Sequence, residues 1–68
     1  MALKEDTREL RNRIYGSERM IRDHYNGREP FSEEALAQLF DVWGQLKAEF
    51  KEATGRDWRS RLEKEGII

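Results

Sequence analysis

The chain has no cysteine, one proline and one histidine among its 68 residues. Without cysteine it can form no disulfide and no zinc site of the cysteine type. This absence is typical of a reducing compartment, and we expect a cytoplasmic protein. No apolar run approaches the roughly 20 residues of a membrane span. The segment 1–5 also lacks the apolar core of a signal peptide, so we expect no membrane contact.

The sequence also lacks the patterns that mark a site for chemistry. Its five glycines are scattered at expected caps and turns, so they form no phosphate-binding loop. His24 has no nucleophile or metal ligand at a useful spacing, and it lies at the edge of an apolar face. Carboxylates are plentiful, but a catalytic pair needs a shielded pocket, for which a chain this short has little room. We predict no enzymatic activity, no catalytic, cofactor-binding or metal-binding residues, and no small-molecule substrate.

Charged residues make up 40% of the chain, yet the net charge is only -1. Residues 1–28 hold seven basic and five acidic side chains, whereas residues 29–53 hold two basic and six acidic ones. The remaining residues, 54–68, hold four basic and three acidic side chains. This balance argues against a protein that binds polyanions over its whole surface, but it allows local basic patches.

The clearest local pattern predicts a helix over about residues 33–54. Ser32 is suited to cap it, because a serine hydroxyl can accept a hydrogen bond from an unpaired N–H of the first turn. Gly55 stands where the chain must become left-handed to leave the helix. Apolar residues recur at helical spacing between these ends, namely Leu36, Leu39, Phe40, Trp43, Leu46 and Phe50.

The flanking residues predict two further helices. Leu10, Ile14 and Ile21 share one face of a helix over about residues 5–25, and a turn over 26–32 follows. After the long helix, Asp57 can cap a short helix over about residues 58–65. The predicted fold is therefore a single all-α domain, residues 1–68, in which two long helices form an antiparallel hairpin with a short C-terminal helix.

The apolar arc of the second long helix is wider than one partner helix covers. The C-terminal segment, a second copy of the chain or another protein could cover the rest. A core of this size typically supplies only about 3–5 kcal/mol, so a dimeric helical bundle is an alternative architecture. We therefore predict a small protein-interaction module, expected to form a homodimer. The predicted interface residues are Ala37, Val42, Trp43, Gly44, Ala48 and Trp58.

A basic stripe follows the first helix at steps of three or four residues, which places its members on one side. Its members are Lys4, Arg8, Arg11, Tyr15, Arg19 and Arg22. It is either a solvated face with ion pairs, a docking face for the acidic helix of another copy, or an RNA-binding surface. Arginine favours phosphate, and a tyrosine among arginines can stack on an unpaired base. RNA binding is thus the alternative function.

The segment 46–58, LKAEFKEATGRDW, resembles the end of the WHEP domain, a helix-turn-helix appended to several eukaryotic aminoacyl-tRNA synthetases. The resemblance extends more loosely back to Arg13. It implies a helical hairpin that binds tRNA, other RNA or proteins through basic helix surfaces. The residues that it implies for RNA contact are Arg13, Arg19, Arg22, Lys47 and Lys51. This chain departs from the family pattern in two ways, because its turn is longer and its second helix is net acidic.

Overall fold

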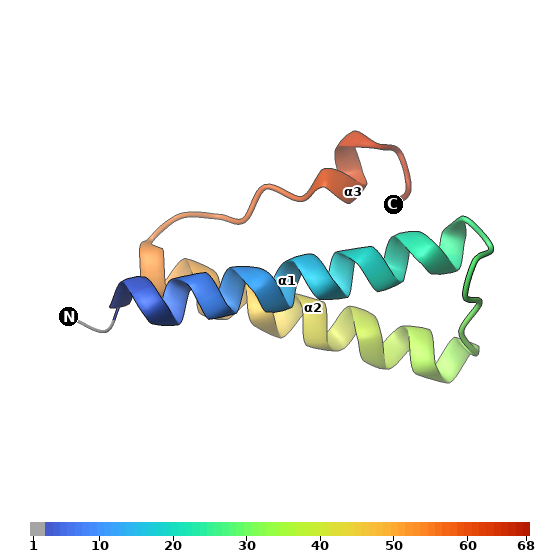
Figure 1. Ribbon diagram of the computed structural model, residues 1–68, viewed down its shortest axis with the longest axis horizontal. Coiled ribbons are helices and arrows are strands. Elements are labelled where there is room, and N and C mark those ends of the chain that lie inside the picture. The colour runs from blue at the N-terminus through green and yellow to red at the C-terminus, as the bar shows by residue number, and fades with distance from the viewer. Residues whose placement is uncertain (1–2) are drawn as a thin grey trace.

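The computed structural model describes the backbone of residues 3–68 and the side chains of residues 7–68. Every regular element in that part of the chain is a helix: α1 (Leu3–Tyr25), α2 (Glu33–Thr54) and α3 (Arg61–Lys64). Figure 1 shows α1 and α2 side by side as an antiparallel hairpin. The predicted fold class is confirmed, and α1 begins two residues earlier than expected.

Helix α2 has the ends that its sequence predicts. The Ser32 hydroxyl accepts a hydrogen bond of 3.1 Å from the Ala35 backbone N–H. Gly55 is left-handed, with φ of 75°, and its N–H donates to the Lys51 carbonyl at 2.7 Å. Because both ends are satisfied by residues close in sequence, these boundaries need no help from the rest of the fold.

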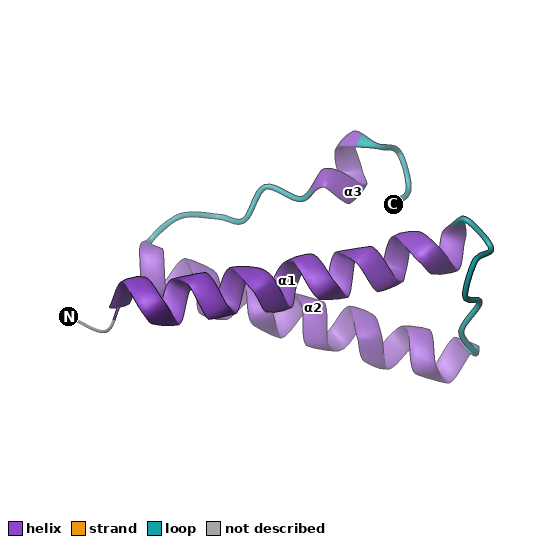
Figure 2. Ribbon diagram, viewed as in Figure 1, coloured by secondary structure: helices purple, strands orange, loops and turns teal. Residues whose placement is uncertain are grey.

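The short helix differs from its expected bounds. It begins at Arg61 with Ser60 as N-cap, and the Ser60 hydroxyl accepts a 3.1 Å hydrogen bond from the Leu62 N–H. The expected cap, Asp57, instead lies 3.2 Å from Lys51 Nζ, as measured to its Oδ1. Trp58 therefore precedes the helix and belongs to the non-helical stretch that Figure 2 draws in teal.

Residues 55–68, which we call the strap, turn back from the end of α2 and run alongside α1 (Figure 1). Gly66 ends α3 in the left-handed conformation, with φ of 75°. The turn is closed by hydrogen bonds from Gly66 N–H to the Glu63 carbonyl and from Ile67 N–H to the Leu62 carbonyl. This C-cap brings Ile67 back onto the core, a hydrophobic contact that often accompanies a glycine at the end of a helix.

The core joins all three parts of the chain. Ile14 and Ile21 of α1 pack with Trp43 and Leu46 of α2 and with Leu62 of the strap. Partly buried around them are Leu10, Leu39, Phe40, Phe50, Trp58 and Ile67. Of the three covers proposed for the apolar arc, the C-terminal segment thus supplies at least one part. In residues 3–68 no helix is long and apolar enough to cross a membrane.

Candidate functional site

A buried carboxylate lies at the meeting point of both long helices and the strap. Glu18 is 2% exposed, and its Oε2 accepts hydrogen bonds from two indole N–H groups. Trp43 of α2 donates at 3.2 Å and Trp58 of the strap at 2.8 Å. Burying a charged group costs free energy unless the group is hydrogen-bonded, so these two donors offset the cost of burying the Glu18 carboxylate.

The ring of Trp58 is held by two further aromatic side chains. Tyr15 of α1 and Phe50 of α2 each meet it edge to face, with ring centroids 5.1 Å apart in both pairs. The polar edge of the indole thus faces Glu18, while its ring packs between both long helices. Trp58 thus attaches the first half of the strap to both long helices, next to the exposed ion pair between Asp57 and Lys51.

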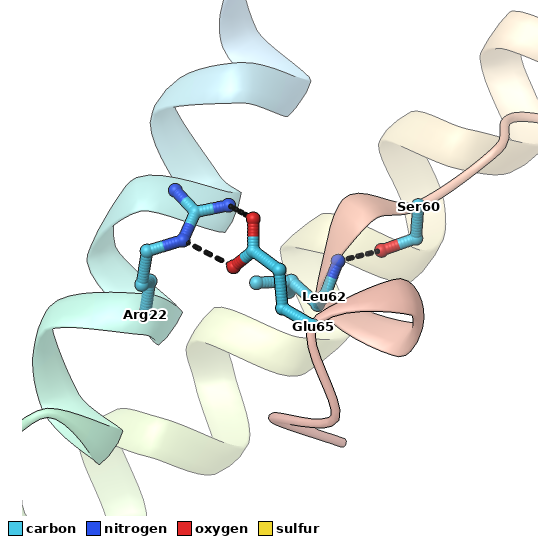
Figure 3. Close-up of polar contacts among 4 residues, drawn as sticks. All are labelled: Arg22, Ser60, Leu62 and Glu65. Carbon is cyan, nitrogen blue, oxygen red and sulfur yellow. Dashed lines mark hydrogen bonds and ion pairs between the residues drawn. The ribbon is translucent and has the colours of Figure 1, made fainter.

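A second polar contact attaches the far half of the strap. The Arg22 guanidinium forms a two-point ion pair with Glu65, with Nε–Oε1 at 2.8 Å and Nη2–Oε2 at 3.2 Å (Figure 3). The hydrogen bond that Arg22 donates to Glu65 raises the pKa of this already strongly basic guanidinium group. Arg22 therefore serves the strap and is not a free cation of the predicted basic stripe.

Between the strap and the hairpin lies an arginine-lined groove made of two adjoining hollows that share Arg11, Phe50 and Arg56. We call it the arginine groove. Its charged and aromatic lining residues are Arg8, Arg11, Tyr15, Phe50, Arg56, Asp57, Trp58, Arg59 and Arg61. Two of the arginines come from α1 and three from the strap, so the folding back of the strap creates the groove.

The lining of the arginine groove is strongly positive although the whole chain is not. Five arginines and one aspartate give it a formal charge of +4, against -1 for the entire sequence. The single acid, Asp57, is itself paired with Lys51 outside the groove. None of the five arginines forms an ion pair with a described side chain. No described acidic side chain therefore neutralises these guanidinium groups.

The structure divides the predicted basic stripe. Arg8, Arg11 and Tyr15 line the arginine groove, and Tyr15 is 48% exposed. Arg19 is exposed but does not line the groove, and Arg22 is paired with Glu65. Lys4 lies outside the residues whose side chains the structure describes.

Most residues that the WHEP resemblance implies for RNA contact have partners within the chain. Arg13 pairs with Glu9 at 3.3 Å, and Lys51 pairs with Asp57. Lys47 Nζ lies 3.6 Å from the centroid of the Trp43 ring, in a cation–π contact. Arg19 alone of the five has no such described contact.

The predicted protein interface does not form one continuous surface. Trp43 is 6% exposed and belongs to the core, and Trp58 is partly buried against it. Ala37, Gly44 and Ala48 are exposed on one side of α2. Val42 is 48% exposed but precedes Gly44 by two residues, which rotates it by about 200° around the helix, to the other side.

Four site residues were missed by the sequence reasoning, namely Glu18, Arg56, Arg59 and Arg61. The signal for Glu18 was present, because position 18 falls between Ile14 and Ile21 at steps of four and three, on the buried face. Buried tryptophans also need acceptors for their N–H groups. The strap arginines gave only a mildly basic tail, and their position depends on a long-range fold.

His24 has a local structural contact. Its Nδ1 accepts a 2.8 Å hydrogen bond from the Phe31 N–H, and its ring stacks on Phe31 with centroids 5.9 Å apart. Within the described part of the chain, no three acidic or histidine side chains gather in a way that would hold a metal ion. Comparisons with protein-family models, curated proteins and solved structures each return no match.

Proposed function

We propose that the protein is a non-enzymatic module that binds single-stranded segments of RNA in the arginine groove. The observation that carries this proposal is the gathering of five arginines from two separate segments of the chain, none of them ion-paired with a side chain that the structure describes. Isolated surface arginines are common. A formal charge of +4 on the lining, in a chain of net charge -1, instead concentrates positive electrostatic potential at one place.

The lining chemistry suits a nucleic-acid strand. Arginine guanidinium groups bind phosphate oxygens with two parallel hydrogen bonds, which gives geometry as well as charge. Tyr15 and Trp58 lie among these arginines, and Tyr15 is half exposed. Exposed aromatic rings beside cations stack unpaired bases, which favours single strands over duplexes.

A charge-reversal experiment tests this function. The double variant Arg11→Glu, Arg56→Glu removes one arginine from α1 and one from the strap, and we expect it to lose RNA binding. The matched control is Arg13→Glu, Arg28→Glu, which changes the net charge equally at exposed residues outside the groove. Fluorescence anisotropy with a labelled, unstructured RNA oligomer measures both.

The parent should bind more weakly as salt rises, with a logarithmic slope of about -0.7 for each phosphate contact to a single strand. Five such contacts correspond to a slope of about -3.5. Equal loss of affinity in both double variants would show that only total charge matters and would refute the assigned site. Absence of binding by the parent at low salt would refute the function.

Self-association is the second candidate, and a different surface supports it. A separate hollow is lined by residues of α1 and α2, among them Arg13 and Glu49, and by no residue of the strap. Met20 follows Arg13 by seven residues on α1, and Val42 precedes Glu49 by seven residues on α2. Each of them therefore lies on the same helix face as its counterpart. These apolar side chains are 44% and 48% exposed. A second hairpin packed there would bury both.

This candidate predicts that the sedimentation coefficient of the parent rises with protein concentration. Val42→Glu should abolish the rise, because burying an unpaired carboxylate in an apolar contact is costly. Ala37→Glu is the control, since Ala37 is exposed on the opposite side of α2. A parent that sediments as a single chain at every concentration would exclude the homodimer.

A further inference from the structure

We propose that Glu18 is the positioning residue of the arginine groove, which it assembles by holding Trp58 of the strap. The part of this inference that concerns RNA rests on the proposed function. The part that concerns the strap does not, because its position can be measured without any ligand.

The strap depends on side chains for its position. In the described structure no backbone–backbone hydrogen bond joins residues 56–60 to α1 or α2. The bond from Trp58 to Glu18 is the polar tie within this stretch that reaches across to α1. Trp58 also lies among the three strap arginines, two residues after Arg56, next to Arg59 and three residues before Arg61. Fixing Trp58 therefore places all three.

The hydrogen bonds of Glu18 can be tested separately from its negative charge. Both indole N–H groups bond to the same oxygen, Oε2. A glutamine offers one carbonyl oxygen with two acceptor sites, so it can replace Oε2 without carrying charge. The negative charge itself opposes anion binding nearby. Glu18→Gln should therefore keep the strap in place and bind RNA at least as tightly as the parent.

Trp58→Phe is the variant that breaks the tie while keeping an aromatic ring between Tyr15 and Phe50. Its matched control is Trp43→Phe, which removes the other indole N–H from the same oxygen but leaves the strap bond intact. Both variants remove one donor from Glu18 and shorten one aromatic side chain, which is buried at Trp43 and partly buried at Trp58. They differ in whether the lost donor belongs to the strap.

The first measurement follows the strap without RNA. Amide hydrogen exchange, read residue by residue by NMR, should be faster in Trp58→Phe at Leu62, Gly66 and Ile67, whose N–H groups are bonded within the strap. Exchange at the centre of α2 should rise less than exchange at these strap amides, which separates release of the strap from unfolding of the hairpin. In Trp43→Phe the strap amides should stay protected relative to those of α2.

The second measurement is RNA affinity at several salt concentrations. We expect Trp58→Phe to bind about tenfold more weakly, because a chain with a released strap presents two arginines to the strand instead of five. Its salt slope should be shallower by about 2, the loss of three phosphate contacts to a single strand. Trp43→Phe should retain the parental slope and stay within about twofold of the parental affinity.

The outcomes separate the two proposals. Strap amides that exchange equally in Trp58→Phe and in the parent would overturn the role of Glu18, whatever the RNA result. A released strap with unchanged affinity and slope would show that the strap arginines bind nothing, and would likewise overturn it. If the parent binds no RNA, the proposed function fails, and a strap released only in Trp58→Phe still supports Glu18 as its anchor.

Discussion

Two acidic residues attach the strap to α1, and they do so under different physical conditions. Glu18 is buried and its Oε2 accepts from two indoles, so loss of one partner leaves a buried carboxylate with a single hydrogen bond from these rings. Glu65 is paired with Arg22 near the surface, where water screens the attraction. We therefore expect the hydrogen bond to Glu18 to stabilise the docked strap more than the ion pair with Arg22 does.

The ion pair between Arg22 and Glu65 should contribute little to stability. The two side chains are 30% and 42% exposed, and exposed pairs are typically worth about 0.2–1 kcal/mol. A double-mutant cycle with Arg22→Ala, Glu65→Ala and both together, measured by urea denaturation, should give a coupling within this range. A coupling well above it would show that the pair is shielded from water and holds the strap more strongly than we infer.

The arginine side of this pair should not make stability depend on pH near neutrality. The pKa of Arg22 is raised by its hydrogen bond with Glu65. A raised pKa contributes stability that is complete below the pKa of the unfolded chain and is lost only as pH rises through the folded value. Both lie far above neutral for a guanidinium group. The Arg22→Ala cost should therefore be the same at pH 7 and pH 9.

At the level of elements, the sequence predicted best where local chemistry decides. Ser32 and Gly55 set the ends of α2, and each acts through hydrogen bonds to residues three or four positions away. The predicted start of α3, near residue 58, was wrong because Asp57 and Ser60 are both residues that cap helices well. Asp57 pairs with Lys51, and Trp58 packs on the hairpin, so the later cap is used.

The candidate site was predictable only in the part that lies on one helix. Arg8, Arg11 and Tyr15 recur at helical spacing, so their shared side followed from the sequence alone. Arg56 and Arg59 join them through a contact between residues 40 positions apart, Glu18 and Trp58. No periodic pattern encodes such a contact. The arginine groove is a property of the folded strap, and its larger share therefore required the structure.

The whole molecule is small enough that the strap is part of its core as well as its site. A core of this size supplies only about 3–5 kcal/mol. Of the five hydrophobic residues that are buried among the described side chains, Leu62 comes from the strap and is fully buried. Burial of one leucine side chain is worth about 1.5–3 kcal/mol, a large fraction of that total. Stability and the arginine groove thus depend on the same segment.

Removal of the strap should therefore unfold the hairpin. We expect a chain of residues 1–54 to lose the cooperative thermal transition of the parent in far-UV circular dichroism, because Trp43 and Leu46 lose the cover of Leu62 and Glu18 loses one of its two donors. A chain lacking only Ile68 is the control, since that residue is exposed and outside the core. It should melt as the parent does. A 1–54 chain that melted cooperatively at the parental temperature would show that α1 and α2 stabilise each other without the strap, and the strap would then be an addition made for binding alone.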